Sequence, residues 1–185
     1  MREMWTHLDM KQTLLIIDMQ DEFDTARVPR VIKACRRELQ AAIKRSDCIL
    51  FVEYGSYTPT LPQLTSLVKG YDKAFFCNKP TDNGSEQVNA AVWRYNLPLN
   101  FRVCGVNANC CVWETVFGLR GLMPGDTPFV VVADAVNAED GRGGYNELYA
   151  IRFLLDHLGE WKASDFPVVN ERNLRRRLNR LKMAA

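Results

Sequence analysis

Short apolar runs alternate with longer segments of helical periodicity along most of this 185-residue chain, and this alternation limits the possible folds more than any other feature. Five runs have the length and the β-branched or aromatic character of strands: Thr13–Ile17, Cys48–Val52, Phe75–Cys77, Phe101–Val106 and Phe129–Ala133. The helices predicted between and after them are Pro29–Arg45, Ser85–Tyr95 (with Ser85 as its cap), Cys111–Arg120 and Gly144–His157. Because strands that are apolar throughout are typical of a parallel sheet covered on both faces, we predict a three-layer α/β/α sandwich with a central, mostly parallel sheet.

The domain organisation predicted from this pattern is one domain over residues 1–170, with a possible edge strand at Ala163–Val169, followed by a basic tail over residues 171–185. In the tail, Leu174, Leu178 and Leu181 recur at helical spacing among arginines. We expect an amphipathic helix that docks its leucines on the body or on another subunit. Contact with nucleic acid is the alternative, and it rests on the tail alone.

Composition excludes several classes of function. The net charge is only +2, so the surface as a whole is not a polyanion-binding field. No apolar run approaches the roughly 18 residues that span a bilayer, and Met1–Lys11 lacks the apolar core of a signal peptide. The six cysteines form no CxxC pair, so neither a zinc knuckle nor a thioredoxin-type motif is present, and we predict reduced thiols in a cytoplasmic protein. With only His7 and His157, most metal-hydrolase and serine–histidine schemes are excluded as well.

Chemically reactive side chains follow three of the predicted strands. Asp18 comes directly after the first strand, Lys79 lies two residues after the third, and Cys110 and Cys111 lie just past the fourth, where a helix begins. Ligands of such sheets bind outside the carboxyl ends of the strands, so these groups are expected to converge on one edge. A helix N-terminus and a lysine stabilise a thiolate, and a carboxylate can accept the thiol proton and return it to a leaving group. Nucleophilic acyl transfer without histidine is therefore possible here.

The segments that carry these residues resemble one known family. LLIIDMQDEF (Leu14–Phe23), the lysine in FFCNKP, CGVNANCCVWET (Cys104–Thr115) and VVVADAVNA (Val130–Ala138) are similar to segments of the isochorismatase-like cysteine hydrolase superfamily, and the likeness extends from about Thr13 to Leu158. The resemblance implies that Asp18 is the general acid and base, Lys79 the activating cation and Cys111 the nucleophile. It also implies a cis peptide at Val106–Asn107 and an oxyanion hole formed by the amides of Asn107 and Cys111.

The reaction implied by this resemblance is hydrolysis of a C–N bond in a small amide, carbamoyl or ureido compound through a thioester on Cys111. Cys110 is the competing candidate for the nucleophile. The family's metal-dependent nicotinamidases have histidines after the second strand, where this chain has Tyr54-Gly55-Ser56-Tyr57, so we expect no metal and no cofactor. Ala108-Asn109 replaces the family's common Thr-Asp pair. A catalytically weak binding or regulatory protein on the same fold, or a nicotinamidase-like enzyme, therefore stays open as an alternative.

Four further residues are candidates for substrate binding. Arg27 has the planar guanidinium that suits a substrate carboxylate, although a surface arginine is the simpler interpretation. Phe23, Tyr54 and Trp113 either line the pocket or pack in the core. The family usually forms dimers or tetramers, so a homo-oligomer is expected, with a small molecule as the other partner and no membrane partner. The sequence does not identify the substrate, because the loops Phe23–Val28, Gly55–Pro62 and Asp82–Gly84 determine specificity.

Overall fold

The computed structural model describes residues 11–138 and Asn179, the latter a helical and exposed residue. The strands are β1 (Thr13–Ile17), β2 (Cys48–Tyr54), β3 (Ala74–Lys79), β4 (Phe101–Val106) and β5 (Phe129–Asn137). The helices are α1 (Pro29–Arg45), α2 (Pro62–Thr65), α3 (Ser85–Tyr95) and α4 (Cys111–Leu122), with a 3-10 turn, η1, at Ser66–Val68. None of the helices described here is long and apolar enough to cross a membrane.

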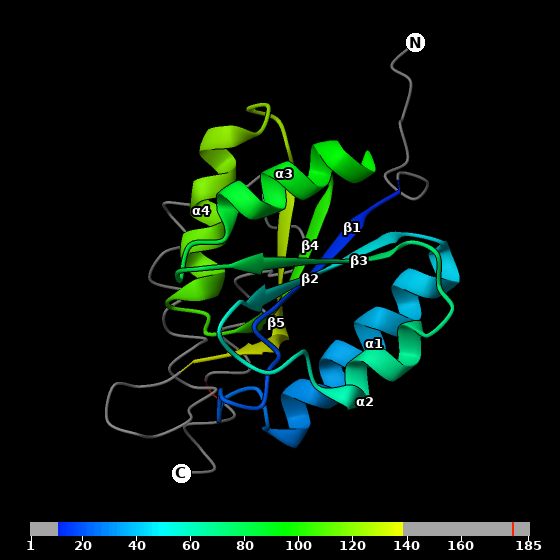
Figure 1. Cartoon of the computed structure of the whole chain (residues 1–185), viewed down its shortest axis with the longest axis vertical. Coiled ribbons are helices and arrows are strands. Elements are labelled where there is room, and N and C mark those ends of the chain that lie inside the picture. The colour runs from blue at the N-terminus through cyan, green and yellow to red at the C-terminus, as the bar shows by residue number, and fades with distance from the viewer. Residues whose placement is uncertain (1–10, 139–178, 180–185) are drawn as a thin grey trace.

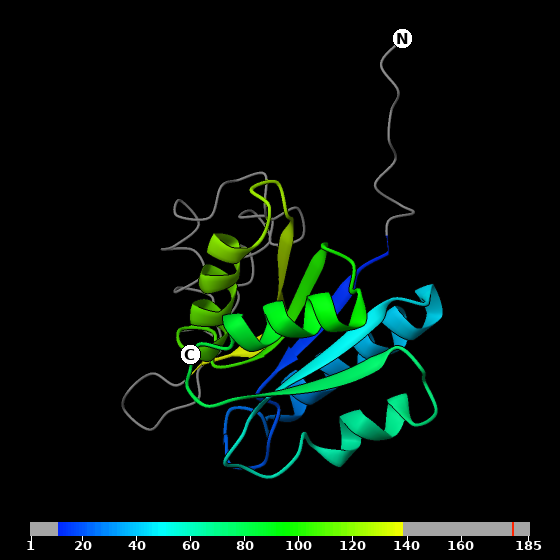
Figure 2. The same cartoon turned by 45° about the horizontal axis from the view of Figure 1, so that its top comes forward.

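The five strands form one parallel sheet in the order β3-β2-β1-β4-β5. Helices α3 and α4 cover one face, and α1 with the short α2 covers the other (Figures 1 and 2). Each face has its own apolar core, one including Leu15, Val88 and Val116 and the other including Ile16, Val31 and Leu39. The predicted sandwich is thus confirmed, and its strands bring their carboxyl ends to a single edge.

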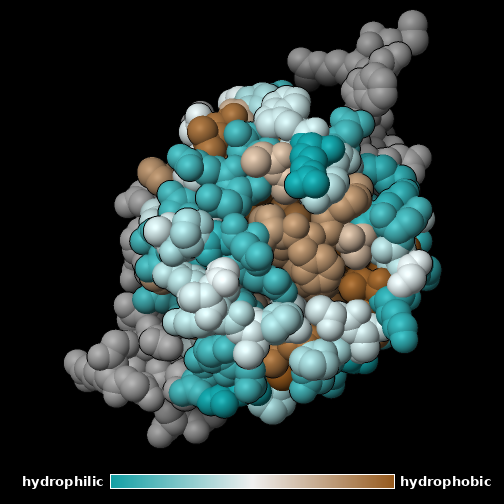
Figure 3. Space-filling view, in the orientation of Figure 1, coloured by the Kyte–Doolittle hydropathy of each residue, from teal (hydrophilic) through white to brown (hydrophobic). Residues whose placement is uncertain are grey.

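Strand β3 forms one edge of the described sheet, and its exposed side chains are Phe76 and Asn78. Phe76 on this strand is 46% exposed although it stacks on Phe51, with ring centroids 4.8 Å apart. In the space-filling view, apolar side chains gather over β3 between more polar surroundings (Figure 3).

Several predicted boundaries differ from the structure. Strands β2, β3 and β5 and helix α4 all extend beyond the predicted segments, and β5 continues past a register shift against β4 between Val103 and Gly105. Lys79 is therefore the last residue of β3 and does not lie beyond it. Ser85 is also not the cap of α3, because it is the first helical residue and its amide donates to Oδ1 of Asn83 at 2.9 Å. The predicted elements Gly144–His157, Ala163–Val169 and the basic tail lie outside the described residues, except for Asn179.

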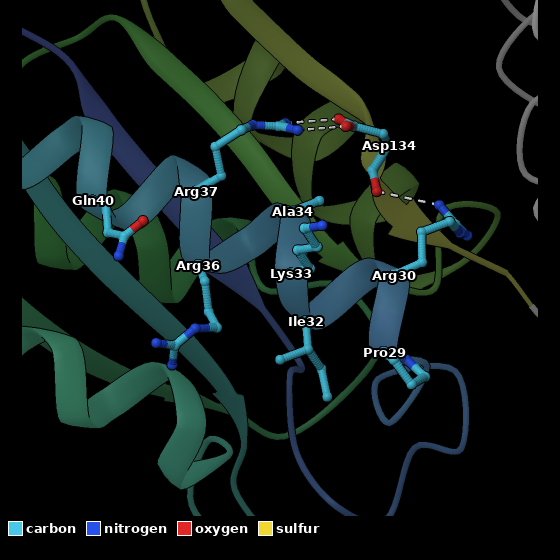
Figure 4. A pocket seen from close by; sticks show the side chains of 9 residues that line it. All are labelled: Pro29, Arg30, Ile32, Lys33, Ala34, Arg36, Arg37, Gln40 and Asp134. Atoms are coloured by element: carbon cyan, nitrogen blue, oxygen red, sulfur yellow. Dashed lines mark hydrogen bonds and ion pairs between the residues drawn. The ribbon is translucent and has the colours of Figure 1, made fainter.

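A charged network joins α1 to strands β4 and β5. The carboxylate of Glu38, buried on α1, accepts hydrogen bonds from Arg102 on β4 and from its neighbour Arg37. Arg37 also donates to both carboxylate oxygens of Asp134 on β5, at 2.6 and 2.9 Å (Figure 4). Burial raises the pKa of Glu38, but the two arginines outweigh burial, so the pKa lies below its ordinary value of 4.5.

We expect Glu38→Ala to lower the free energy of unfolding by about 3 kcal/mol at neutral pH, because it leaves a partly buried guanidinium without its partner. A carboxylate whose pKa is lower in the folded state stabilises the protein above its unfolded-state pKa and loses that effect as pH falls through the folded-state pKa. Urea unfolding between pH 7 and pH 3 should therefore show a shallower acid loss of stability in Glu38→Ala than in the wild type. Glu86→Ala, at an exposed residue of α3, is the control, and equal losses in both variants would contradict the assigned role.

Candidate active site

Asp18 lies at the carboxyl end of β1, at the centre of the sheet, and is fully buried. Its amide donates to the carbonyl of Val52 at 2.9 Å, and its φ of 51° falls in the left-handed region that a residue other than glycine rarely adopts. Such backbone conformations persist where the surrounding structure enforces them, and they are concentrated at functional sites. The neighbouring strand thus fixes the direction in which the carboxylate points.

Lys79 is buried along its whole length and forms an ion pair with Asp18. Its Nζ lies 2.8 Å from Oδ2 of Asp18 and 4.5 Å from the centre of the Tyr54 ring, and it donates to the carbonyl of Thr81 at 2.9 Å. The alkyl stem passes so close to Gly84 that a Cβ at position 84 would lie 2.8 Å from Cδ of the lysine. The lysine is therefore held from several sides.

Cys111 is the first residue of α4, and a tight turn after β4 places it there. The turn is built on the carbonyl of Asn107, which accepts hydrogen bonds from the amides of Cys110 at 3.1 Å and Val112 at 3.0 Å. The peptide between Val106 and Asn107 is cis, as expected. Among the residues that the structure describes, no hydrogen-bond acceptor is found for the backbone amides of Asn107 and Cys111.

The thiol of Cys111 is flanked by two carboxylates. It interacts with Asp18, and its Sγ also donates to Oδ1 of Asp82 at 3.4 Å. Asp82 belongs to the loop between β3 and α3, which sequence analysis named only as a specificity loop. The same loop is tied to α4, because the amide of Gly84 donates to Oγ1 of Thr115 at 2.9 Å. The signal that identifies Asp82 is its place three residues after Lys79, in a loop that starts from the carboxyl edge.

The charges around Cys111 correct one expectation. A thiolate stabilised by the helix and the lysine was predicted, but burial and the neighbouring charge of Asp18 raise the pKa of Cys111 well above its ordinary value. Lys79 acts in the opposite direction without offsetting these effects. Burial also raises the pKa of Asp18 above 3.8, although Lys79 and Cys111 lower it. The resting site thus favours a protonated thiol beside a carboxylate that is more basic than usual.

Aromatic side chains lie over one side of this site. Tyr54 stacks on Tyr57 with centroids 5.0 Å apart, and Phe23 meets both rings edge-on. A hollow of about 380 Å³ lies where the end of β2 and the loop after it meet the end of β3. The residues that line it are Tyr54, Gly55, Ser56, Asn78, Lys79 and Pro80. Two of the predicted substrate-binding residues, Phe23 and Tyr54, are therefore brought together next to Lys79. Tyr57 was missed because nothing in a loop sequence determines which tyrosine folds back.

Gln20 and Glu22 hold these loops in place. The buried side chain of Gln20 accepts from the amide of Tyr54 at 2.7 Å and donates to the carbonyls of Tyr54 at 3.1 Å and Thr58 at 2.7 Å. The carboxylate of Glu22 accepts from the amide and the hydroxyl of Thr58, both at 2.8 Å. The loop after β1 and the loop after β2 therefore form one rim of the site.

The other two predicted substrate-binding residues have neighbours outside this aromatic group. Arg27 is exposed and forms an ion pair with Asp24 three residues before it. Trp113 is half-buried on α4 and stacks on Phe117, with centroids 5.5 Å apart. A second hollow, of about 780 Å³, runs along α1 between Arg36, Arg37 and Asp134 (Figure 4), and none of Asp18, Lys79 and Cys111 lines it.

The cysteines are all free, as predicted. Cys110 is half-buried, and burial together with Asp82 raises the pKa of its thiol to about 11. One group of possible metal ligands occurs among the described residues: a carboxylate oxygen of Asp82 and the sulfurs of Cys110 and Cys111, all within 4.8 Å of one another.

Several solved structures of other proteins have a similar fold. The nicotinamidase SaPncA from Staphylococcus aureus matches with a TM-score of 0.63 and 15% identity over 81% of this chain and 95% of its own. An isochorismatase from Pseudomonas putida matches with a TM-score of 0.60 and 18% identity over 78% and 84%. The chain has the isochorismatase-like fold. No family model and no curated protein sequence matches it.

A protein whose name gives a different activity also matches this chain. The MAR1 ribonuclease from Caenorhabditis elegans matches with a TM-score of 0.63 and 20% identity, over 80% of this chain and 74% of its own. At such identities the likeness establishes the fold, and the reaction has to be argued from the side chains of the site.

Proposed function

We propose that the protein is a cysteine hydrolase that cleaves a C–N bond of a small amide, carbamoyl or ureido compound. The observation that carries this proposal is the buried Asp18–Lys79 ion pair at 2.8 Å, in contact with a cysteine at the first residue of α4. A buried pair of this kind costs desolvation free energy, and packing alone does not require it. Perturbed carboxyl and thiol pKa values in one place are typical of acid–base and nucleophilic chemistry.

The proposed first step is a proton transfer from Cys111 to Asp18 as the substrate carbonyl approaches. The raised pKa of Asp18 suits this role, because a more basic carboxylate accepts the thiol proton more readily. The thiolate attacks the carbonyl carbon, and the carbonyl oxygen becomes an oxyanion. The amides of Asn107 and Cys111, which lack acceptors among the described residues, are the proposed donors to this oxygen.

In the second half of the proposed reaction, Asp18 gives up the proton that it took from Cys111. Asp18 donates it to the nitrogen as the C–N bond breaks, which releases an amine and leaves a thioester on Cys111. Asp18, again a carboxylate, takes a proton from water as the water attacks the thioester. The tetrahedral intermediate collapses to a carboxylic or carbamic acid as the C–S bond breaks, and Asp18 returns its proton to the departing sulfur, which restores the thiol and the carboxylate. Lys79 keeps Asp18 ionised between steps and balances its charge.

The hollow of about 380 Å³ beside Lys79 is the proposed place for part of a small substrate. Tyr54 and Lys79 line it, whereas Asp18 and Cys111 do not. Of the Ala108-Asn109 pair, Ala108 is 1% exposed and packs in the core with Val112, so its side chain does not reach the hollow beside Lys79. The enzyme proposal rests on the buried ion pair beside Cys111 and not on this pair.

The test is to trap the thioester. The protein is incubated with a panel of primary amides, carbamoyl and ureido compounds, amine or ammonia release is followed, and acid-quenched samples are digested for mass spectrometry. We expect an acyl adduct on Cys111 with the compounds that are turned over, and the same adduct in Cys110→Ala. An adduct on Cys110, or turnover that leaves Cys111 unmodified under single-turnover conditions, would overturn the mechanism.

A further inference from the structure

The pair of consecutive thiols and the carboxylate of Asp82 form a cluster that the hydrolytic mechanism does not use as a whole. Cys110 and Cys111 are provided by the turn into α4, and Asp82 comes from the loop after β3. The carboxylate accepts a hydrogen bond from the Cys111 thiol at 3.4 Å, and it also lies close enough to Cys110 to raise the pKa of that thiol. The carboxylate oxygen and the two sulfurs all lie within 4.8 Å of one another.

The chemistry of these atoms selects a class of cation. Thiolate sulfur binds zinc and other soft metals, whereas magnesium and calcium prefer oxygen ligands. Two sulfurs that share a Zn²⁺ ion at about 2.3 Å lie about 3.8 Å apart in tetrahedral geometry. The 4.8 Å within which the three ligand atoms of the cluster lie is about 1 Å wider than this spacing. Three protein ligands leave a fourth position for water, as in open zinc sites.

The charge balance also favours exchange of the protons for an ion. With both thiols protonated, the cluster carries the single negative charge of Asp82. When a divalent ion binds, each thiol releases its proton to solvent, and two thiolates, one carboxylate and the ion again sum to one negative charge. The buried surroundings of Cys111 therefore see no added net charge. Asp82 is exposed and Cys110 half-buried, so the ion has a path from solvent.

We propose that Asp82, Cys110 and Cys111 form a binding site for a thiophilic divalent cation of the zinc class. An ion held there occupies the sulfur of Cys111 and prevents it from attacking a substrate. The site is then inhibitory, and it gives a role to Cys110, which hydrolysis does not require. Binding itself does not depend on hydrolysis, whereas the inhibitory effect rests on the proposed function.

The experiment uses Cd²⁺ as the probe, because cadmium bound to thiolate produces a ligand-to-metal absorption in the ultraviolet and needs no substrate. The full-length, reduced protein is titrated with Cd²⁺ while absorbance and heat of binding are recorded. We expect one tight equivalent with thiolate absorption in the wild type. Loss of a ligand should weaken binding by about a hundredfold or more, since outer partners alone are worth about 10–100-fold.

The variants decide which thiols bind the ion. Cys110→Ala and Asp82→Asn should both lose affinity, whereas Cys77→Ala, which removes a half-buried thiol outside the cluster, should bind as the wild type does. Bound Cd²⁺ should also slow iodoacetamide alkylation of Cys111. The proposal is overturned if the wild type shows no thiolate absorption, or if Cys110→Ala binds as tightly as Cys77→Ala. Binding in the absence of any hydrolytic activity would contradict only the proposed function.

Discussion

Asp18→Asn should lower kcat by at least about a thousandfold and at the same time make Cys111 react faster with iodoacetamide. The carboxamide neither accepts the thiol proton nor returns it to the leaving nitrogen, so both halves of the reaction lose their acid and base. The negative charge that raises the pKa of Cys111 is also gone, while Lys79 stays beside the thiol. The pKa of Cys111 should therefore fall, and alkylation at neutral pH should become faster. Mass spectrometry of the Cys111 peptide across pH measures this effect.

Two companion variants separate this mechanism from a structural role of Asp18. Lys79→Met should slow the alkylation of Cys111, because it removes a positive charge that lowers the pKa of this thiol. Asp21→Asn, at an exposed residue of the same loop, should change neither kcat nor the rate at which Cys111 is alkylated. Removing one partner of a buried ion pair costs about 3–5 kcal/mol, so folding of each variant is checked by circular dichroism. If Cys111 in folded Asp18→Asn reacts more slowly than in the wild type, Asp18 is not its base.

Gly105→Ala should destabilise the fold by more than about 4 kcal/mol, the largest effect on stability that we expect from a single methyl group. Gly105 on β4 has a φ of 124°, and a Cβ there would lie 2.0 Å from the carbonyl oxygen and 2.7 Å from the amide nitrogen of Ile17. The atoms that it meets belong to the backbone of the central strand β1, which cannot turn aside as a flexible side chain does. Either the β1–β4 pairing breaks, or Asp18 moves with the strand.

The matched control is Gly121→Ala on α4, where an added Cβ meets nothing within 4 Å. Alanine is favoured over glycine inside a helix by about 1 kcal/mol, so this variant should be slightly more stable than the wild type. Urea unfolding of the two variants measures the difference. A Gly105→Ala protein with the unfolding midpoint of the wild type would show that β4 approaches β1 less closely than described.

The sequence was sufficient to predict how the site is assembled. Apolar runs flanked by helical segments predict a parallel sheet, and parallel strands end at one edge, so the sequence alone predicts Asp18, Lys79 and Cys111 at that edge. Local composition and the direction of the strands are enough for this prediction. It therefore holds despite the errors in strand length, such as the two residues added at the carboxyl end of β3 that make Lys79 part of the strand itself.

The parts that were missed depend on contacts between loops. Asp82 reaches the thiol because the loop after β3 is fastened to Thr115 on α4, and Tyr57 reaches Tyr54 because Gln20 holds the loop after β2. Side-chain hydrogen bonds between residues far apart in the sequence leave no periodic signal. The direction of the Cys111 pKa was missed for a related reason, since it depends on burial and on the place of Asp18 relative to the thiol.

The tight passage between Lys79 and Gly84 has a consequence for the chemistry of the lysine. Its Cδ lies 2.8 Å from where a Cβ of residue 84 would be, and its ammonium is paired with Asp18 and lies near the Tyr54 ring, so the side chain is held away from a swing toward a bound molecule. It cannot act as a mobile arm that grips a substrate, nor as an amine that attacks one. It acts as a stationary positive charge whose orientation is settled when the chain folds, so no reorganisation is needed when the reaction begins.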